Sequence, residues 1–407
     1  NFIKTGQLDA GVVRVGPETT FAPGYDPSQK ASMGVDSNCT ALFHFDGSLN
    51  SHKGVSATFT RASAAYLSDG TQVEAGQPRF EPAKFGQGLM VEEAETNIIT
   101  SPQDLTVHAY KNPDLTITTN VDGNADRVSN VGSASEYIKQ DITADGGPLT
   151  LTVIIKKETM NTIDVGLYDQ TAGAYITRND GVVLSASYVA ISVSAGSTVS
   201  GHTIKPYIWF TSGDAVILGI MVSRKAYPTS FIDGTRSPET LTIPTAGVID
   251  TQKGTIAMWM KMGKNGSPGP SGVHDNYISL NAGIWAINQG NGQANALRFI
   301  VGDTWGTSTT VTVNIAWDKD DLLFIVPSWD LPNISLTVYN YTKGTTATAT
   351  ATGATYTATP TLAHVNCGDG GQFSGYTNSI IDELRIDKVC RTDEEIAAWY
   401  KANAPFY

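Results

Sequence analysis

The sequence IDELRI at residues 381–386, followed by VCRT at residues 389–392, stands directly before the clearest helix signal in the chain. Thr392, with Glu395 three positions later, matches a capping box, in which each side chain binds the backbone N–H of the other residue. Three apolar residues that follow share one helical face: Ile396, Trp399 and Tyr400. We therefore expect one helix near the C-terminus, docked through this face.

The rest of the chain favours strands. Charged residues make up 16% of the sequence, below the roughly 25% of an average soluble domain, while hydrophobic residues make up 41%. Short apolar or alternating segments recur between turn signals, which is typical of β-sandwiches. The clearest strand candidates are residues 149–155, 206–210, 215–222, 255–261, 296–301, 309–316, 322–326 and 334–339.

Two segments have unusual composition. Residues 1–38 are punctuated by Gly and Pro and hold few apolar side chains, so we expect an extended arm that folds only against partner subunits. Residues 345–359 consist almost entirely of Thr and Ala. Their alternating β-branched residues predict an exposed pair of strands.

The charge and cysteine content exclude some classes of protein. The formal net charge is −12 and the sequence pI is 4.9, which opposes binding to nucleic acid or to anionic membranes. The three cysteines are too few for a disulfide framework. We expect Cys39, Cys367 and Cys390 to be free thiols, with a bridge from Cys39 to Cys390 as the alternative.

Three strings resemble one protein family. They are ALFHFDGSL at residues 41–49, KFGQGL at residues 84–89, and the C-terminal segment at residues 381–396. Together they resemble the laminin-G-like, or concanavalin A-like, sandwich domains of bacterial and phage surface proteins. In that family the first and last strands are neighbours, so the resemblance implies that residues 41–45 lie beside residues 381–386.

A second resemblance lies between these strings. The phrase LMVEEAETNIIT at residues 89–100 is similar to one in phage tail and fibre proteins, where it precedes a jelly roll like those of carbohydrate-binding modules. AYPTSFI at residues 226–232 resembles the close of such a module. The implied all-β architecture is a discontinuous concanavalin A-like sandwich with an inserted jelly roll, an extended N-terminal arm and one C-terminal helix. Its expected divisions are the arm at 1–38, the laminin-G-like sandwich at 39–100 and 236–407, and the insert at 101–235.

The sequence offers no convincing catalytic centre. Glycosidases need two carboxylates roughly 5–10 Å apart. Asp382 and Glu383 are adjacent and no acid follows at the alternate position, so we expect no glycosidase activity there. Glu93 and Glu95 have the alternate spacing, but a solvated face is the favoured interpretation. We expect the protein not to be an enzyme.

A calcium site is one interpretation of two acids. Hard cations bind carboxylate and carbonyl oxygens, and Asp46 would lie near Asp382 if the strands that precede and contain them pair. In the alternative interpretation Asp46 caps its own turn, and Asp382 binds backbone or Arg385.

Three aromatic residues are candidates for sugar stacking: Trp285, Trp305 and Tyr376. Amide and carboxylate residues surround them in the sequence, which suits carbohydrate recognition. Core packing is the alternative for each of them.

The resemblances imply a structural protein of a bacteriophage particle, such as a tail fibre or baseplate component, assembled in the host cytoplasm and exposed on the particle surface. The implied partners are other virion proteins through residues 1–38, further copies of the chain in a homo-oligomer, with a trimer favoured, and host surface glycans. The alternative is a secreted bacterial glycan-binding module without catalytic activity. A glycoside hydrolase is a third hypothesis, opposed by the absent acid pair.

Overall fold

The computed structural model describes residues 35–108, 114–132, 136–266, 274–289, 293–368, 373 and 375–403, together with a short strand pair, β1 (Val13–Val15) and β2 (Glu18–Thr20). Apart from this pair, the arm expected at residues 1–38 lies outside the described residues as far as residue 34. No helix in the described part of the chain is long and apolar enough to cross a membrane.

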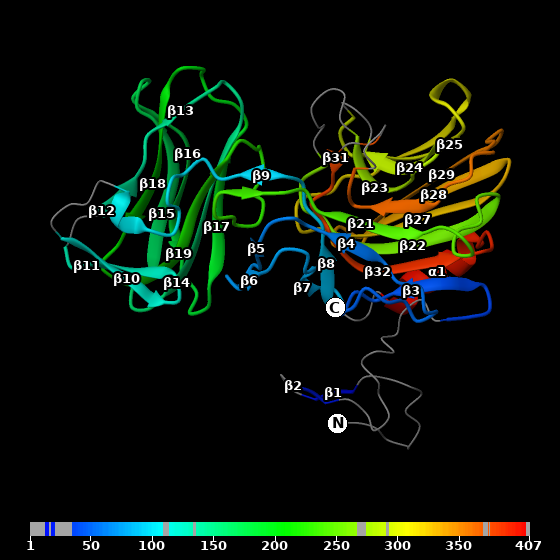
Figure 1. The fold of residues 1–407 in the computed structure, drawn as a ribbon, viewed down its shortest axis with the longest axis horizontal. Helices are drawn as coiled ribbons and strands as arrows, with labels where there is room; N and C mark the ends of the chain where they lie inside the picture. The colour runs from blue at the N-terminus through cyan, green and yellow to red at the C-terminus, as the bar shows by residue number, and fades with distance from the viewer. Residues whose placement is uncertain are drawn as a thin grey trace.

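The larger of two sandwiches consists of two eight-stranded sheets. One sheet runs β29 (Thr345–Ala351), β28 (Asn333–Asn340), β27 (Leu322–Asp330), β22 (Lys253–Lys261), β32 (Ile380–Asp387), β8 (Gly86–Met90) and β7 (Arg79–Ala83), with β3 (Cys39–Phe43) also paired to β32. The other runs β26 (Thr309–Asn314), β25 (Ala296–Gly302), β24 (Ile284–Gln289), β23 (Asp275–Leu280), β30 (Leu362–Val365), β21 (Thr240–Pro244) and β4 (Thr58–Thr60), with β31 (Gly375–Tyr376) beside β23. Each of the two sheets therefore contains strands from before residue 91 and strands from after residue 239 (Figure 1).

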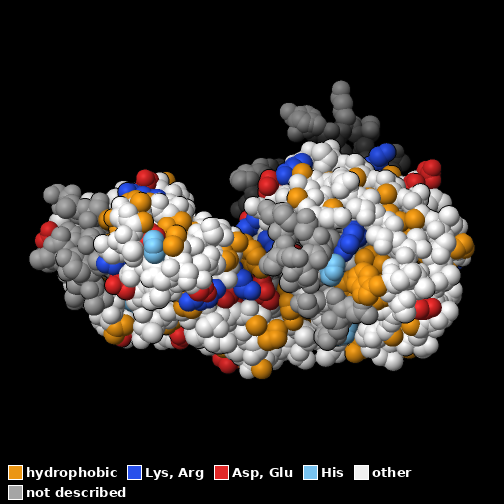
Figure 2. Space-filling model, turned by 90° about the horizontal axis from the view of Figure 1, so that it is seen from above, with side chains coloured by type: hydrophobic (Ala, Val, Ile, Leu, Met, Phe, Trp, Pro, Cys, Tyr) orange, Lys and Arg blue, Asp and Glu red, His pale blue; other side chains and the backbone are white. Residues whose placement is uncertain are grey.

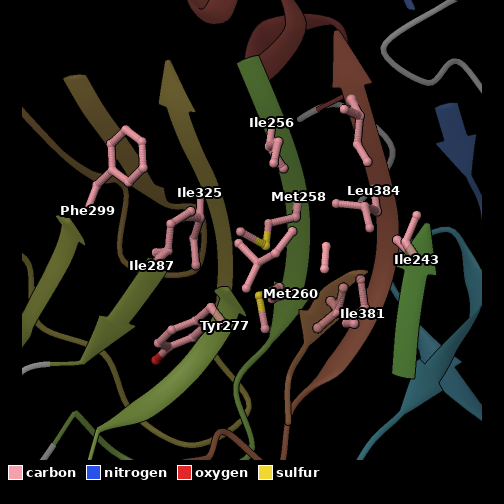
Figure 3. Packing of buried hydrophobic residues seen from close by; sticks show 14 of the residues in the cluster. Ile243, Ile256, Met258, Met260, Tyr277, Ile287, Phe299, Ile325, Ile381 and Leu384 are labelled. Carbon is pink, nitrogen blue, oxygen red and sulfur yellow. The ribbon is translucent and has the colours of Figure 1, made fainter. Parts of the chain in front are cut away.

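Strands β3 and β32 are antiparallel neighbours, with Phe43 opposite Leu384. Both side chains are fully buried in the core between the two large sheets. Figure 3 shows Met258 and Met260 of β22 lying with Leu384 in the same apolar space. The strand β22 is buried on both faces, and Ile256, Met258 and Met260 enter this core because every second side chain faces the opposite sheet.

The second sandwich contains two five-stranded sheets. One runs β10 (Leu115–Asp122), β11 (Ala125–Asn130), β19 (Gly213–Ser223), β14 (Leu149–Lys157) and β17 (Val189–Ala195). The other runs β12 (Glu136–Lys139), β18 (Thr203–Phe210), β15 (Thr162–Asp169) and β16 (Ala174–Val183), with β13 (Ile142–Thr143) paired to β18. The chain is therefore all-β with two sandwiches and one C-terminal helix, as the sequence predicts, and the second sandwich lies on the left in Figure 1.

Each strand segment named from the sequence coincides with a strand, but the Thr- and Ala-rich segment differs from expectation. Residues 345–351 form one strand, β29, at the edge of its sheet, and residues 352–359 have no regular structure. Backbone amides of Thr357 and Ala358 donate hydrogen bonds to Asp303, and Tyr356 is buried. These contacts hold the second half of the segment against the sandwich, so it does not pair with β29.

The helix α1 (Asp393–Asn403) begins as its sequence predicts. The Thr392 N–H donates to Glu395 Oε2 at 2.9 Å, and the Glu395 N–H donates to Thr392 Oγ1 at 3.3 Å, which completes the capping box. Ile396 is buried, and Trp399 and Tyr400 pack on a small apolar cluster on the outer face of β22 and β27. The amphipathic face therefore docks the helix on the larger sandwich.

The two sandwiches meet through an apolar contact and a strand pair. The pair joins β9 (Glu95–Thr96), where the chain enters the second sandwich, to β20 (Thr235–Arg236), where it returns. A hairpin of the larger sandwich, β5 (Ala65–Tyr66) and β6 (Gln72–Val73), packs on the second sandwich. The rings of Tyr66 and Phe231 lie 5.0 Å apart in a cluster with Val216 and Leu218.

Five charged side chains form a buried ion-pair cluster beside this junction: Arg61, Arg79, Arg236, Glu92 and Glu239. All five are at most 3% exposed. Arg61 pairs with Glu239 at 2.9 Å, and Arg236 pairs with Glu92 at 3.0 Å. Because unpaired buried charges are strongly unfavourable, the cluster fixes the relative positions of the segments that supply it.

Candidate functional site

The two acids predicted to bind calcium both bind backbone amides of the β7–β8 hairpin. Asp382 Oδ2 accepts a hydrogen bond from the Phe85 N–H at 2.5 Å, and Asp46 Oδ1 accepts one from the Gln87 N–H at 3.3 Å. Among the described residues there is no group of three or more His, Cys, Asp or Glu side chains that could hold a metal ion. Calcium prefers six to eight oxygen ligands. The two carboxylates and their surroundings do not provide the ligand set of a calcium site.

Asp382 is the extra residue of a β-bulge. Glu383 lies opposite Trp259, and Ile381 lies opposite the next residue, Met260. Glu383 contacts His44 through its carboxylate and the ring Nδ1. Asp382 and Glu383 are 2% and 1% exposed, so a glycan could not reach either carboxylate in this structure.

Glu93 and Glu95 do not form the solvated face that their spacing suggested. Glu95 is buried, and Glu93 binds Lys225 at 2.7 Å and accepts a hydrogen bond from Asn378 at 2.9 Å. Burial opposes ionisation of Glu93, but the Lys225 ammonium outweighs it and lowers the pKa. The return of the chain brings Lys225 to this carboxylate, a contact that a local pattern could not indicate.

Trp285 cannot stack on a sugar, which corrects the prediction for this residue. Its ring is fully buried and packs edge-on against Phe299 at 5.0 Å and Trp329 at 5.1 Å in the main core. The residue belongs to β24, where its side chain faces the opposite sheet. Core packing, the alternative interpretation, holds for it.

Trp305 and Tyr376 lie in different environments. Trp305 begins a short 3-10 turn, η3 (Trp305–Thr307), is 43% exposed, and stacks on His274 with ring centroids 5.8 Å apart. Tyr376 is half-buried against the core, and this burial raises its pKa to about 12. No ring contact joins the two side chains in the described structure. Trp305 keeps the exposure that sugar stacking requires.

A larger group of aromatic side chains lies on the second sandwich. Tyr168 of β15, Tyr175 of β16, and Tyr207 and Trp209 of β18 form what we call the aromatic surface. The ring centroids of neighbouring members are 4.7–6.5 Å apart, so the rings are contiguous. Tyr175 is 38% exposed, and Tyr207, with rings on three sides, is 8% exposed. None of the four belongs to an apolar core cluster of the described residues.

Strand pairing explains why these rings meet. Tyr207 and Trp209 are two positions apart, so both point to the outer face of the sheet, opposite the buried Ile208. Tyr168 lies opposite Tyr175. The partner of Tyr207 on β15 is Gly166, which has no side chain to compete with the rings for space on this face.

Charged groups border the aromatic surface. The Arg178 guanidinium lies 5.1 Å from the Tyr175 ring centroid and 4.8 Å from that of Trp209. It binds Asp164 at 2.9 Å and also contacts Asp180. Such stacking holds the guanidinium flat against the rings. Tyr175 is the one ring of the group that is more than a third exposed, and charged side chains that can donate and accept hydrogen bonds lie beside it.

The aromatic surface was not among the sites predicted from the sequence, although part of its signal is local. Residues 206–210 were assigned as a strand, and the spacing of Tyr207 and Trp209 places two aromatic side chains on one face. Tyr168 and Tyr175 could be added only with the pairing of β15, β16 and β18, which is set by tertiary structure.

Comparison with known proteins places the larger sandwich in a fold class. Residues 234–397 match the model of the concanavalin A-like lectin/glucanases superfamily. This region includes most strands of the larger sandwich, and the match confirms the concanavalin A-like, laminin-G-like fold expected from the sequence.

The solved structures similar to the chain include three with low sequence identity. One is the CBM22-1–CBM22-2 tandem domain of Paenibacillus barcinonensis Xyn10C, at 9% identity and TM-score 0.26, covering 73% of this chain and 99% of that one. The LG1–3 region of the laminin α2 chain has 8% identity and TM-score 0.24, and the match covers 63% of this chain and 68% of that one. Domains LG4–5 of the mouse laminin α1 chain have 10% identity and TM-score 0.23, and the match covers 74% of this chain and 93% of that one. The comparison with curated proteins found no match.

Proposed function

We propose that this protein is a non-catalytic glycan-binding protein whose second sandwich binds a sugar chain on the aromatic surface. The observation that carries the proposal is the contiguous group of Tyr168, Tyr175, Tyr207 and Trp209, outside any apolar core cluster of the described residues. Aromatic side chains normally pack in a core, and a group of them on an outer face marks a binding site. The concanavalin A-like lectin and glucanase match of the larger sandwich supports a carbohydrate ligand.

The chemistry of the surface suits a pyranose ring. The C–H face of a sugar can stack on an aromatic ring, and its hydroxyl groups can bind charged or polar side chains at the rim. Arg178 and Asp164 supply a donor and an acceptor beside the rings. Because Arg178 is paired with carboxylates, the surface favours an uncharged glycan over an acidic one.

Absence of catalysis is part of the proposal. Glycoside hydrolysis needs two accessible carboxylates flanking the bond that breaks. Asp382 and Glu383 are almost fully buried, and Glu93 is engaged by Lys225. Incubation with bacterial cell-wall and capsule polysaccharides should therefore release no reducing ends, and release that a Glu383→Gln variant lacks would contradict this part.

The first experiment measures binding to a glycan array and then dissociation constants for the sugars that bind. Substituting Tyr207 and Trp209 together by Ala should weaken binding by at least about tenfold, or about 1.4 kcal/mol. Trp305→Ala, an exposed tryptophan on the other sandwich, is the matched control and should leave the dissociation constant unchanged. If Trp305→Ala weakens binding and the double variant does not, the sugar binds at Trp305, and the assignment to the aromatic surface is wrong.

We further infer that the glycan-binding chain is a surface component of a bacteriophage particle, such as a tail fibre or baseplate protein. The phage-like phrases at residues 89–100 and 226–232 support this inference. In this role residues 1–38 contact other particle proteins, and the sandwiches face outward toward host glycans. Deleting residues 1–38 should leave both sandwiches folded and abolish incorporation into particles; normal incorporation would favour the secreted bacterial module instead.

A further inference from the structure

A second concave site lies between the two sandwiches. This interdomain cleft has a volume of ≈ 290 Å³. Its walls include Leu67, Glu81 and Ile380 of the larger sandwich and Ala190 of the second, and Thr229 of the returning chain completes it. Figure 2 shows charged side chains gathered where the two lobes meet. The volume is at the lower end of the roughly 300–1,000 Å³ of small-molecule sites.

One polar group in the cleft lacks a partner. Thr229 is 6% exposed, and its Oγ1 makes no hydrogen bond with the described residues. Leaving a buried hydroxyl unpaired is unfavourable. The neighbouring Ser230 differs, because its hydroxyl binds Glu92 and Arg236 in the buried ion-pair cluster. The Thr229 hydroxyl is closed to solvent in this structure, so it would have to turn toward the cleft to bind a ligand hydroxyl.

A carboxylate in the same wall retains acceptor capacity. Glu81 is 5% exposed, and its two oxygens accept hydrogen bonds from the Ser68 N–H at 2.9 Å and the Ser68 hydroxyl at 2.6 Å. A carboxylate can accept about four hydrogen bonds in all. Glu81 can therefore take further hydrogen bonds from hydroxyl groups, while Leu67, Met90 and Ile380 offer apolar contact to a ring face.

The charges around the cleft are balanced. Asp320 binds Lys261 at 3.3 Å and Lys319 at 2.8 Å, leaving one positive charge on this wall. Glu81 supplies one negative charge on the other wall, and Glu92 is paired with Arg79 and Arg236. A charged ligand would gain little here, whereas an uncharged ring carrying hydroxyl groups fits both the polar and the apolar walls.

We propose that the interdomain cleft binds a single uncharged pyranose ring, independently of the aromatic surface. Thr229 and Glu81 bind its hydroxyl groups, and the aliphatic side chains contact its C–H face. Because residues of both sandwiches line the cleft, binding also links them. The site is formed only when the two sandwiches are joined, so it is a property of the whole chain.

The test is saturation-transfer NMR on the full chain with methyl α-glucoside and N-acetylglucosamine as probes. In the Tyr207→Ala, Trp209→Ala background, which removes the aromatic surface, Ala190→Trp should abolish the transfer, because this exposed residue of β17 lines the cleft and the indole would fill it. Ser187→Trp, at an exposed position near β17 that does not line the cleft, is the matched control and should keep the transfer. Transfer that survives Ala190→Trp in that background, or no transfer from either probe to the unaltered protein, overturns the proposal.

Two further variants distinguish binding in the cleft from binding on the aromatic surface. Thr229→Val should weaken binding about tenfold while keeping or raising the midpoint of thermal unfolding, since it removes an unpartnered buried hydroxyl. A lowered midpoint with unchanged binding would overturn the role of this hydroxyl. The Tyr207→Ala, Trp209→Ala double variant should retain transfer. If it loses transfer while Ala190→Trp keeps it, the sugar binds only the aromatic surface.

Discussion

Arg79 and Glu239 form a bidentate ion pair, in which the guanidinium Nε and Nη2 each donate a hydrogen bond of 2.9 Å to a different carboxylate oxygen. The two residues are 160 positions apart, and the whole second sandwich lies between them in the sequence. Both side chains are fully buried. The pair therefore closes the larger sandwich at the place where the chain departs and returns.

Breaking this pair should strongly destabilise the protein. Glu239→Gln keeps the side-chain shape but leaves the Arg61 and Arg79 charges without their shared partner. We expect a loss of about 3–5 kcal/mol in the free energy of unfolding, measured by urea denaturation. The control is Arg127→Ala, which removes an exposed pair with Glu158 and should cost less than about 1 kcal/mol. Equal effects of the two variants would contradict the role of burial.

Glu92 should make stability sensitive to acid. Burial alone would raise its pKa, but Arg236 and Arg79 lower it from 4.5 to about 2. A carboxylate with a depressed folded-state pKa binds fewer protons than in the unfolded chain, so its contribution is complete above about pH 5 and is lost as the pH falls toward 2. The free energy of unfolding, measured in urea at several pH values across this range, should depend less steeply on pH in Glu92→Gln than in the unaltered protein. If the pH dependence of the unfolding free energy is the same in both proteins, the acid sensitivity comes from other groups.

Lys84 should make stability rise with pH in the alkaline range. Its ammonium is 4.9 Å from the Trp259 ring centroid and 4.3 Å from that of Tyr341. Burial lowers the pKa from 10.5 to about 8, although Asp382 opposes the shift. The folded protein therefore binds fewer protons at this site than the unfolded chain between about pH 8 and 10.5, and its stability should rise there relative to a Lys84→Met variant. A constant difference between the two proteins across this range would disprove the shift.

The three thiols should differ in reactivity. Cys39, Cys367 and Cys390 are free; the first two are buried, and Cys390 is half-buried. Burial raises the pKa of Cys39 to about 11, which removes the reactive thiolate at neutral pH. In the native protein iodoacetamide should modify Cys390 first, and all three thiols should react in urea. A mass of the unreduced protein that corresponds to a Cys39–Cys390 bridge would show that this assignment is wrong.

The sequence predicted the local elements well where a signal lies within a few residues. The capping box of Thr392 and Glu395 forms as expected, and strands such as β14 and β22 occupy the predicted segments. Alternation along a strand depends on neighbours in the sequence, so a local pattern reveals it. The same reasoning failed for residues 352–359, because contacts with the distant Asp303 replace strand pairing.

The candidate site depended more on distant contacts. Trp285 and Trp305 have similar polar neighbours in the sequence, yet the first is fully buried and the second is exposed. The bulge at Asp382 likewise arises in the pairing of β32 with β22, more than a hundred positions away in the sequence. Whether a ring faces solvent or core depends on which sheet covers it, and no local pattern contains that information.

By itself the sequence determined the all-β class, the C-terminal helix and the concanavalin A-like fold of the larger sandwich, since these follow from periodicity, capping and characteristic strings. Tertiary structure alone decided the aromatic surface, the buried ion-pair cluster and the interdomain cleft. Each of these joins residues separated by a turn, a strand or the whole second sandwich, such as Tyr168 with Tyr207 and Arg79 with Glu239. The physical reason is that pairing and burial are set by the whole chain, because each strand satisfies its backbone hydrogen bonds only through partners that other segments provide.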